Sequence, residues 1–380
     1  MMAENNKIRL FVDAHVFDEQ YQGSRTFIKE IYAILAQKKD IDLFLGAYDI
    51  ENLKKNFRDS ENISFVKYKT TSAIARLAYE IPSIINRYKI QYAHFQYIAP
   101  PIKNCKFIVT VHDVIFSEYP NEFSVFYRLS KKFLYKTSAS RADIVTTVSA
   151  YSKNSIEKYL RINPKNIFII PNGVNVKFFE TYDKQIAKKY IKARYGFEKF
   201  ILFISRIEPR KNHVLLLKAY LQLKLYSKGY WLVLLGTRSM RSPEFDRMMN
   251  ELPQKIGQYI FIKNDIGDED LLEFYRAATA FVYPSKAEGF GIPPLEAAAL
   301  KIPVLCSHSS AMNEYSFFGE NHIDPLDYDV FKNKLQEVID GSPDEDHQNN
   351  LSELIRKDYS WIQSAEKLYK VIVSNADRES

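Results

Sequence analysis

The residues best suited to chemistry in this chain form the run E-G-F-G-I-P-P-L-E, from Glu288 to Glu296. Two carboxylates flank a glycine loop, and an apolar segment, 280–283, comes just before them. The run predicts a strand, a loop and a new helix, because Pro294 suits a first helical turn but not a helix interior. Backbone N–H groups of such a loop can bind an anion, and a carboxylate there can bind sugar hydroxyl groups.

A second charged run, S-R-I-E-P-R-K-N, follows another predicted strand at 199–204. It contains Ser205, Arg206 and Lys211 at the start of the next predicted helix. The planar donor fork of arginine and the point charge of lysine both suit a diphosphate. Each run also has a purely structural interpretation, as a helix start or as a solvated turn, so only the combination favours a ligand site.

The elements that must position these runs alternate between strand and helix. The predicted strands are 8–12, 106–111, 144–148, 167–170, 199–204, 231–235, 259–262, 280–283 and 303–306, with helical patterns between them. Such alternation predicts parallel sheets, in which ligands bind beyond the carboxyl ends of the strands. At 380 residues the chain is longer than a single hydrophobic core usually organises. The strand and helix pattern breaks after N-G-V at 172–174, so we expect two doubly wound α/β domains.

Composition narrows the class of protein. An apolar fraction of 46% and a charged fraction of 26% are those of a globular protein, and no apolar run is long enough to cross a bilayer. The polar start of the chain shows no secretory signal, which predicts a cytoplasmic protein. Cys105 and Cys306 fall in different halves, so we expect neither a disulfide nor a zinc site.

The net charge of +7 is concentrated in residues 121–165, where nine basic residues face three acidic ones. Aromatic residues are interleaved with these charges. This composition fits a basic amphipathic helix that contacts an anionic membrane, and it equally fits a solvated helix whose apolar side faces the core. Both interpretations stay open at this point.

The combination of motifs resembles the donor-sugar site of the retaining glycosyltransferases of family 4. Further matches are T-V-H-D-V-I-F at 110–116, N-G-V at 172–174 and Y-P-S at 283–285. The resemblance implies the GT-B fold, in which two Rossmann-like domains face a central cleft. It also implies an N-terminal acceptor domain at 1–175, completed by a crossing helix at 360–380, and a nucleotide-sugar donor domain at 190–358.

The resemblance assigns roles to individual residues. Arg206 and Lys211 would hold the diphosphate, Glu288 the donor sugar and Glu296 the ribose, while His112 would meet the sugar near its reacting carbon. The implied catalytic residues are thus His112, Arg206, Lys211 and Glu288. The implied donor-binding residues are Gly23, Ser205, Arg206, Lys211, Glu288, Gly289, Phe290, Gly291 and Glu296.

The first loop departs from the family pattern. Many relatives carry several glycines there, whereas Gln20–Arg25 holds only Gly23, which weakens the phosphate role of Gly23 and leaves Arg25 as a candidate contact for an anionic acceptor. Three D-x-D runs, at 268–270, 327–329 and 344–346, match a metal motif formally. Asp268 suits a helix N-cap and Asp344 a polar loop, so we expect no metal and no cofactor besides the nucleotide-sugar co-substrate.

The resemblance, which is strongest to mannosyltransferase-like members, implies a retaining glycosyltransferase that acts in surface polysaccharide biosynthesis and transfers a sugar to a glycan or lipid-linked oligosaccharide. The predicted donor is GDP-mannose, with UDP-sugars as the next choice. The resemblance implies a front-side displacement without a dedicated catalytic base. A GT-B-shaped epimerase or phosphorylase is an alternative, and a basic binding module for nucleic acid or anionic lipid is a third. The third leaves the paired runs unexplained, so we expect no nucleic-acid partner.

Overall fold

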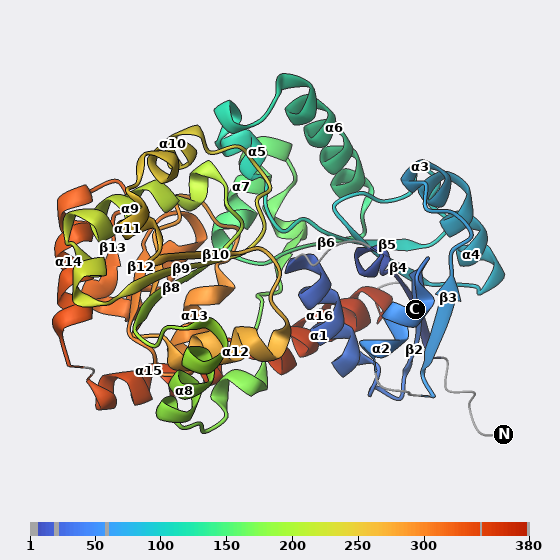
Figure 1. Ribbon diagram of the computed structural model, residues 1–380. Helices are drawn as coiled ribbons and strands as arrows, with labels where there is room; N and C mark the ends of the chain where they lie inside the picture. The colour runs from blue at the N-terminus through green and yellow to red at the C-terminus, as the bar shows by residue number, and fades with distance from the viewer. Residues whose placement is uncertain (1–6, 19–22, 58–60, 343, 378–380) are drawn as a thin grey trace. The chain divides into compact units, whose positions relative to one another are not determined.

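The computed structural model describes residues 7–18, 23–57, 61–342 and 344–377 (Figure 1). The chain divides into two compact units. The first comprises Met1–Gly173 together with Trp361–Ser380, and the second comprises Val174–Ser360. The second unit is therefore inserted, in chain order, between two parts of the first.

The first unit is built on a parallel sheet of seven strands. They are β1 (Ile8–Asp13), β2 (Ile41–Ala47), β3 (Ile63–Lys67), β4 (Tyr92–Gln96), β5 (Lys106–Thr110), β6 (Ile144–Thr147) and β7 (Ile167–Ile169). Their order in the sheet is β3-β2-β1-β4-β5-β6-β7. The order reverses between β1 and β4, and such a switch point is where ligands bind in doubly wound sheets.

Helices connect these strands. They are α1 (Gly23–Leu35), α2 (Ile50–Lys55), α3 (Ala73–Ala75), α4 (Ile81–Arg87), α5 (Ile115–Glu118), α6 (Val125–Arg141) and α7 (Ala150–Leu160), with a π-helical turn at Arg76–Glu80 between α3 and α4. Ser124 and Ser149 begin α6 and α7 as N-caps, since each hydroxyl accepts a hydrogen bond from a first-turn N–H group.

The second unit repeats the plan with six parallel strands in the order β10-β9-β8-β11-β12-β13. They are β8 (Phe200–Ile204), β9 (Trp231–Leu235), β10 (Ile260–Lys263), β11 (Ala280–Tyr283), β12 (Val304–Ser307) and β13 (His322–Ile323). The helices are α8 (Lys184–Tyr195), α9 (His213–Gln222), α10 (Pro243–Glu251), α11 (Gln254–Gly257), α12 (Asp268–Ala277), α13 (Ile292–Ala299), α14 (Tyr328–Asp340) and α15 (Glu345–Asp358). The switch point lies between β8 and β11, the strands that precede the two charged runs.

The last helix, α16 (Trp361–Asp377), returns to the first unit and packs beside α1 (Figure 1). Trp361 is buried, and its ring lies edge-on to Phe27 of α1 at 6.3 Å between centroids. Tyr369 of α16 also donates a hydrogen bond to Asp40, while Lys38 and Glu366 form an ion pair. These contacts bind the end of the chain to its beginning.

The predicted α/β fold with two Rossmann-like units is confirmed, and Cys105 and Cys306 are free thiols. Several local predictions were wrong or incomplete. Strands β2, β3, β4 and β13 were not predicted, because charged and polar residues interrupt them or because they are very short. The stretch 340–350 is not a loop: α14 ends at Asp340 and α15 begins at Glu345, with Asp344 as its N-cap. Gly267, rather than Asp268, is the N-cap of α12.

Candidate functional site

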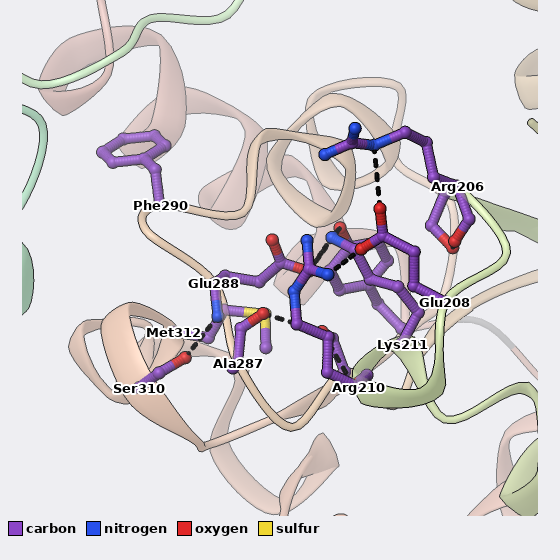
Figure 2. A network of polar contacts seen from close by, with 12 residues as sticks. Arg206, Glu208, Arg210, Lys211, Ala287, Glu288, Phe290, Ser310 and Met312 are labelled. Carbon is purple, nitrogen blue, oxygen red and sulfur yellow. Dashed lines mark hydrogen bonds and ion pairs between the residues drawn. The ribbon is translucent and has the colours of Figure 1, made fainter. Parts of the chain in front are cut away.

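The two charged runs meet at the carboxyl ends of β8 and β11 (Figure 2). Lys211 and Glu288 form an ion pair, and both side chains are about nine-tenths buried. Tyr283, the last residue of β11, donates a hydrogen bond of 2.9 Å to the same Glu288 oxygen. The contact between Lys211 and Glu288 cannot be read from their positions in the sequence. It forms because β8 and β11 are neighbours in the sheet, which brings together the connections that follow them.

Burial and charge act against each other in this pair. Burial lowers the pKa of Lys211 to about 8, although the Glu288 carboxylate favours the ammonium form. Burial alone would raise the pKa of Glu288, but Lys211 and Arg210 outweigh it, so this pKa lies below its ordinary value. Both groups are therefore charged near neutral pH, and the site holds a cation and a carboxylate ready for polar ligands.

A second carboxylate, Glu208, organises the arginines of the run S-R-I-E-P-R-K-N. Glu208 is buried and forms ion pairs with Arg210 and with Nε of Arg206, the latter at 3.2 Å. Ser239, after β9, donates a further hydrogen bond to it. Arg210 is buried, whereas the Arg206 side chain remains 54% exposed. Glu208 thus fixes one edge of the Arg206 guanidinium and leaves the remainder accessible to an anion.

The glycine loop holds Glu288 in place through its backbone. The hydroxyl of Ser310 accepts a hydrogen bond of 2.7 Å from the Glu288 N–H group. Gly291 has φ +91°, and a Cβ at this position would lie 2.9 Å from the Met312 side chain, so only glycine fits. Phe290 is turned away from the polar network (Figure 2), and Tyr315 donates a hydrogen bond to its carbonyl oxygen. The conformation of the glycine loop is therefore held by Ser310, Met312 and Tyr315, which lie in the connection after β12.

Glu296 lies in α13, where its carboxylate accepts a hydrogen bond of 2.7 Å from Tyr275 of α12. Burial raises the pKa of Glu296 to about 7, and the Tyr275 hydrogen bond only partly opposes this. The side chain is thus divided between the neutral and charged forms near neutral pH. A carboxylate can accept hydrogen bonds from two neighbouring hydroxyl groups, as a ribose offers.

Ser205, directly after β8, lies where the connections that follow β8 and β9 come close together. Its N–H group donates to Leu235 at 2.9 Å, and a Cβ on Gly236 would lie 2.2 Å from the Ser205 carbonyl oxygen. Gly236, with φ +139°, is therefore required for the two connections to meet. The sequence analysis did not single out this glycine, although a glycine directly after an apolar strand is a usable signal.

In the first unit, His112 follows β5 and joins a buried polar network on β4. Its Nε2 is hydrogen-bonded to Oε1 of Gln96, and the Gln96 amide nitrogen lies 3.4 Å from Nε2 of His94. His94 is also hydrogen-bonded to Tyr32 and, at 2.6 Å, to Thr110. The sequence analysis missed Gln96 and His94 because it did not predict β4.

The network sets the protonation of His112. An amide oxygen only accepts hydrogen bonds, so Nε2 of His112 carries the proton and Nδ1 keeps its lone pair. Burial lowers the pKa of His112 to about 4 and that of His94, which also faces His112, to about 3. The rings of Phe27 and Tyr97 lie 5.2 and 5.4 Å from the imidazole. His112 is thus a neutral hydrogen-bond acceptor in an aromatic setting.

A further buried carboxylate, Asp13, ends β1 at the switch point of the first sheet. It accepts a hydrogen bond of 2.8 Å from Tyr68 and forms ion pairs with His15 at 3.1 Å and Arg76 at 3.6 Å. Burial raises its pKa, but His15 and Arg76 outweigh burial and bring the pKa to about 2. Arg76 opens a π-helical turn, a feature often found at functional sites. The sequence analysis did not identify this group.

The first loop is only partly described. Residues 20–22 of the predicted contact loop lie outside the described residues, whereas Gly23 begins α1, and a Cβ added to it would meet no atom of the described residues within 4 Å. Arg25 stacks on the ring of Phe17 at 4.9 Å and donates to Asn52 at 3.5 Å. Arg25 is therefore held against its own unit, and its role toward an acceptor stays a prediction.

Two further features concern possible metal ligands and a surface groove. Among the residues that the structure describes, no three His, Cys, Asp or Glu side chains are grouped closely enough to ligate a metal ion. A groove of about 1070 Å³ runs along α9 and α10, and its lining includes Pro209 and Asn212 but not the Lys211–Glu288 pair. Polar side chains, among them Lys218 and Glu244, also line this groove, but the residues that the motif resemblance implicates lie at the Lys211–Glu288 pair, where we place the candidate site.

Two family models match this chain in succession. Residues 21–178 match the model described as Glycosyltransferase Family 4, and residues 185–358 match the model described as Glycosyl transferases group 1. The chain belongs to the glycosyltransferases of family 4. The motif resemblance is thereby confirmed for both halves, although the roles of individual residues stay predictions.

The relatives of this family 4 chain include two O-antigen enzymes. The O-antigen chain mannosyltransferase RfbU of Salmonella typhimurium is 30% identical over 232 residues, which span 60% of each chain. The O-antigen chain mannosyltransferase B of Escherichia coli is 27% identical over 82% of this chain and 84% of its own. The crystal structure of Anabaena HepE in complex with UDP-glucose superposes with a TM-score of 0.73 at 15% identity, covering 96% and 99% of the two chains, and shows the shared GT-B fold.

Proposed function

We propose that this family 4 chain is a retaining mannosyltransferase that uses GDP-mannose and extends a glycan or lipid-linked oligosaccharide during assembly of a surface polysaccharide. The observation that carries the proposal is the buried Lys211–Glu288 pair beside the half-exposed Arg206. A nucleotide sugar presents a diphosphate next to a polyol, and this site presents cations next to a carboxylate. The charge pattern of the ligand and that of the site are complementary.

Each residue of the site has a distinct proposed part. Arg206 and Lys211 contact the diphosphate, and their charge offsets the negative charge that grows on it as the glycosidic bond breaks. Glu288, once Lys211 is shared with phosphate, accepts hydrogen bonds from sugar hydroxyl groups. Glu296 binds the ribose, with Tyr275 holding its carboxylate. His112 accepts a hydrogen bond from a sugar hydroxyl through Nδ1.

The proposed reaction is a front-side displacement. The bond between the anomeric carbon and the phosphate oxygen breaks, a bond from the acceptor oxygen to the same face of that carbon forms, and the acceptor proton passes to the leaving phosphate oxygen. No protein base is needed, so the residues contribute position and charge stabilisation of an oxocarbenium-like transition state. Retention of the anomeric configuration follows from attack on the same face.

The donor assignment is supported by the names of the relatives, two of which are O-antigen mannosyltransferases. HepE, by contrast, was crystallised with UDP-glucose, which keeps UDP-sugars as the competing donors. Within the described residues, no helix is both long and apolar enough to span a bilayer. We propose that the protein acts in the cytoplasm on an acceptor presented at the membrane.

A nucleotide-sugar screen tests the proposal directly. GDP-mannose should raise the Tm, and a ligand at 100 times its Kd stabilises the folded state by about 2.7 kcal/mol. Incubation with an oligosaccharide acceptor should then yield an α-linked product from the α-linked donor, as read by proton NMR. A β-linked product would contradict retention, and the absence of stabilisation by any nucleotide sugar would contradict the donor site.

The same assays separate the alternative enzymes. A GT-B-shaped epimerase would convert the nucleotide sugar without an acceptor, and a phosphorylase would release sugar phosphate from a glycan in the presence of phosphate. A basic binding module would bind nucleic acid in a salt-dependent manner that survives Glu288→Ala and Arg206→Ala. Transfer to an acceptor that both substitutions abolish supports only the glycosyltransferase.

A further inference from the structure

Helix α6 carries apolar side chains on two opposite faces. The face toward the unit consists of Tyr135, Ser138 and Ala139, which are buried. Phe126, Leu129 and Phe133 are 83%, 64% and 69% exposed. Their spacing of three and four residues aligns them in one stripe, about 180° around the helix from the buried residues. We call these three residues the apolar stripe.

The apolar stripe is not explained by the packing of the unit. Single exposed apolar residues are common on protein surfaces, but three large ones in a row on one helix face mark a contact surface. The core-facing requirement of α6 is already met by the opposite side of the helix. The expectation that the apolar side of this segment faces the core is therefore correct for one face only.

The charge of α6 identifies the kind of surface that fits the stripe. The helix contains five basic residues and no acidic residue: Arg128, Lys131, Lys132, Lys136 and Arg141. Lys132 and Lys136 are exposed and lie beside the stripe on the helix surface, and the Lys131 ammonium lies within 5.7 Å of the Tyr127 and Tyr135 rings. Aromatic residues flanked by cations, without acids, match the boundary between anionic headgroups and acyl chains.

Helix α8 in the second unit offers an internal comparison. It too has five basic residues and no acidic residue, over Lys184–Tyr195. However, Ile186 is the single aliphatic side chain among its strongly exposed residues, and its cations Lys192 and Arg194 are paired with Glu198 and Asp270. Helix α8 thus matches α6 in its number of basic residues but lacks the apolar stripe, so variants of the two helices compare basic residues beside a stripe with basic residues without one.

We propose that α6 docks the protein on an anionic phospholipid bilayer. The apolar stripe enters the headgroup and upper acyl region, and Lys132 and Lys136 contact lipid phosphates. The helix lies along the membrane plane, since residues 126 to 133 extend about 10 Å along the axis. The proposal deepens the proposed function, on which it rests for the claim that a lipid-linked acceptor is presented at the membrane, and it assigns the partner surface to named residues.

Vesicle sedimentation tests the docking with the full chain. We expect binding to vesicles containing phosphatidylglycerol to exceed binding to pure phosphatidylcholine by roughly tenfold or more, and to weaken with salt. The triple variant Phe126→Ser, Leu129→Ser, Phe133→Ser should lose roughly tenfold or more, and Lys132→Glu with Lys136→Glu a similar factor. The matched control on α8, Lys188→Glu with Lys189→Glu, should bind as the unchanged chain does.

A fluorescence measurement guards against misfolded variants. Phe126→Trp places an indole on the stripe, and its emission should shift to the blue only with anionic vesicles, since the bilayer interface excludes water from it. Unchanged Tm and unchanged stabilisation by GDP-mannose show that the triple variant is folded. Vesicle binding that fails while GDP-mannose still stabilises the chain overturns the docking and leaves the proposed function intact; the reverse result overturns the donor site alone.

Other partners give different results. If the stripe joins two copies of this chain, light scattering shows a dimer that the triple variant abolishes, and the vesicles bind nothing. If it contacts another protein, the chain again fails to sediment with anionic vesicles. Either result overturns the proposal, as does equal binding of the α6 variants and the α8 control.

Discussion

His112 and Gln96 form a hydrogen bond in which the imidazole Nε2–H donates to the amide oxygen, although Gln96 ends β4 and His112 lies in the connection after β5. The amide nitrogen of Gln96 in turn faces His94, which fixes the orientation of the amide. Gln96 therefore acts as a positioning residue. It keeps Nδ1 of His112 free of a proton and suitable for accepting a hydrogen bond from a hydroxyl group.

Gln96→Glu tests this relationship. The carboxylate can accept the same hydrogen bond but adds a negative charge, which favours the imidazolium, so the pKa of His112 should rise from about 4 toward its ordinary value of 6.5 or above. The kcat/KM for transfer should then fall as the pH drops below that value, where the unchanged enzyme keeps a neutral His112. A pH–rate profile and histidine NMR measure the change.

Thr110→Val is the matched control for that substitution. Thr110 contacts His94 rather than His112, so its loss should leave the acid limb of the profile where it is. Identical profiles for Gln96→Glu and the unchanged enzyme would show that Gln96 does not control His112.

Glu288→Gln tests the buried pair. The substitution leaves the Lys211 ammonium buried without a carboxylate, and breaking a buried ion pair typically costs about 3 kcal/mol or more. Urea unfolding should report that loss, and kcat should fall by roughly a hundredfold if the site holds the donor sugar. The control is Glu244→Gln, which breaks the exposed pair with Lys218 and should cost about 1 kcal/mol or less. Equal stability losses for the two variants would contradict a special role for burial.

We expect the affinity for GDP to depend on the protonation state of Glu296. Its folded pKa of about 7 lies above the ordinary 4.5, so the folded state binds the extra proton between these values, and this group lowers stability as pH rises through that window. The Glu296 carboxylate, which we propose accepts ribose hydrogen bonds, becomes the major form above about pH 7. GDP affinity by calorimetry should therefore increase across that pH.

Tyr275→Phe should raise the pKa of Glu296 further. The Tyr275 hydroxyl donates a hydrogen bond that favours the charged carboxylate, and the substitution removes this donor. GDP affinity should then require a higher pH in the variant, with little change in its maximum. An unshifted midpoint would exclude Tyr275 as a partner that tunes Glu296.

Gly291→Ala tests the loop geometry. The φ of +91° is unfavourable for alanine, and the new Cβ would lie 2.9 Å from Met312, so we expect a loss of about 1–3 kcal/mol in the free energy of unfolding and a raised KM for the donor. Gly257→Ala is the control, since nothing lies within 4 Å of its Cβ position. A neutral Gly291→Ala would show that the loop tolerates another conformation.

The sequence predicts the fold class well because apolar strands such as Phe200–Ile204 and Ala280–Tyr283 are continuous and each leads into a helix. It also predicts which runs hold the candidate site, since ligands bind after the strands of a doubly wound sheet. The pairing of Lys211 with Glu288 was not predictable, because strand order places β8 beside β11 and the sequence does not state that order.

Supporting residues were predicted less well than the residues they support. Tyr275 and Ser310 contact the site residues from elements distant in sequence, and neither belongs to a recognisable motif. Glu208 lies within the run S-R-I-E-P-R-K-N, but its ion pairs with Arg206 and Arg210 were not predicted. Gln96 and His94 lie in a strand that reads Y-A-H-F-Q, where polar residues face a buried network instead of solvent. A pattern of alternating apolar and polar residues would place these polar side chains on a solvent-exposed face of the sheet, whereas they are buried.

The insertion of the second unit within the first has a consequence for biosynthesis. During translation the second unit, Val174–Ser360, is made before α16, so the first unit at that stage still lacks the helix that packs beside α1. The Phe27 ring of α1 lies edge-on to both Trp361 and His112, so the surroundings of His112 form only once α16 has been made. A nascent chain stopped before Trp361 should therefore bind the nucleotide sugar and yet transfer nothing, which a truncation at Ser360 can measure. We therefore expect sugar transfer to depend on the synthesis of α16.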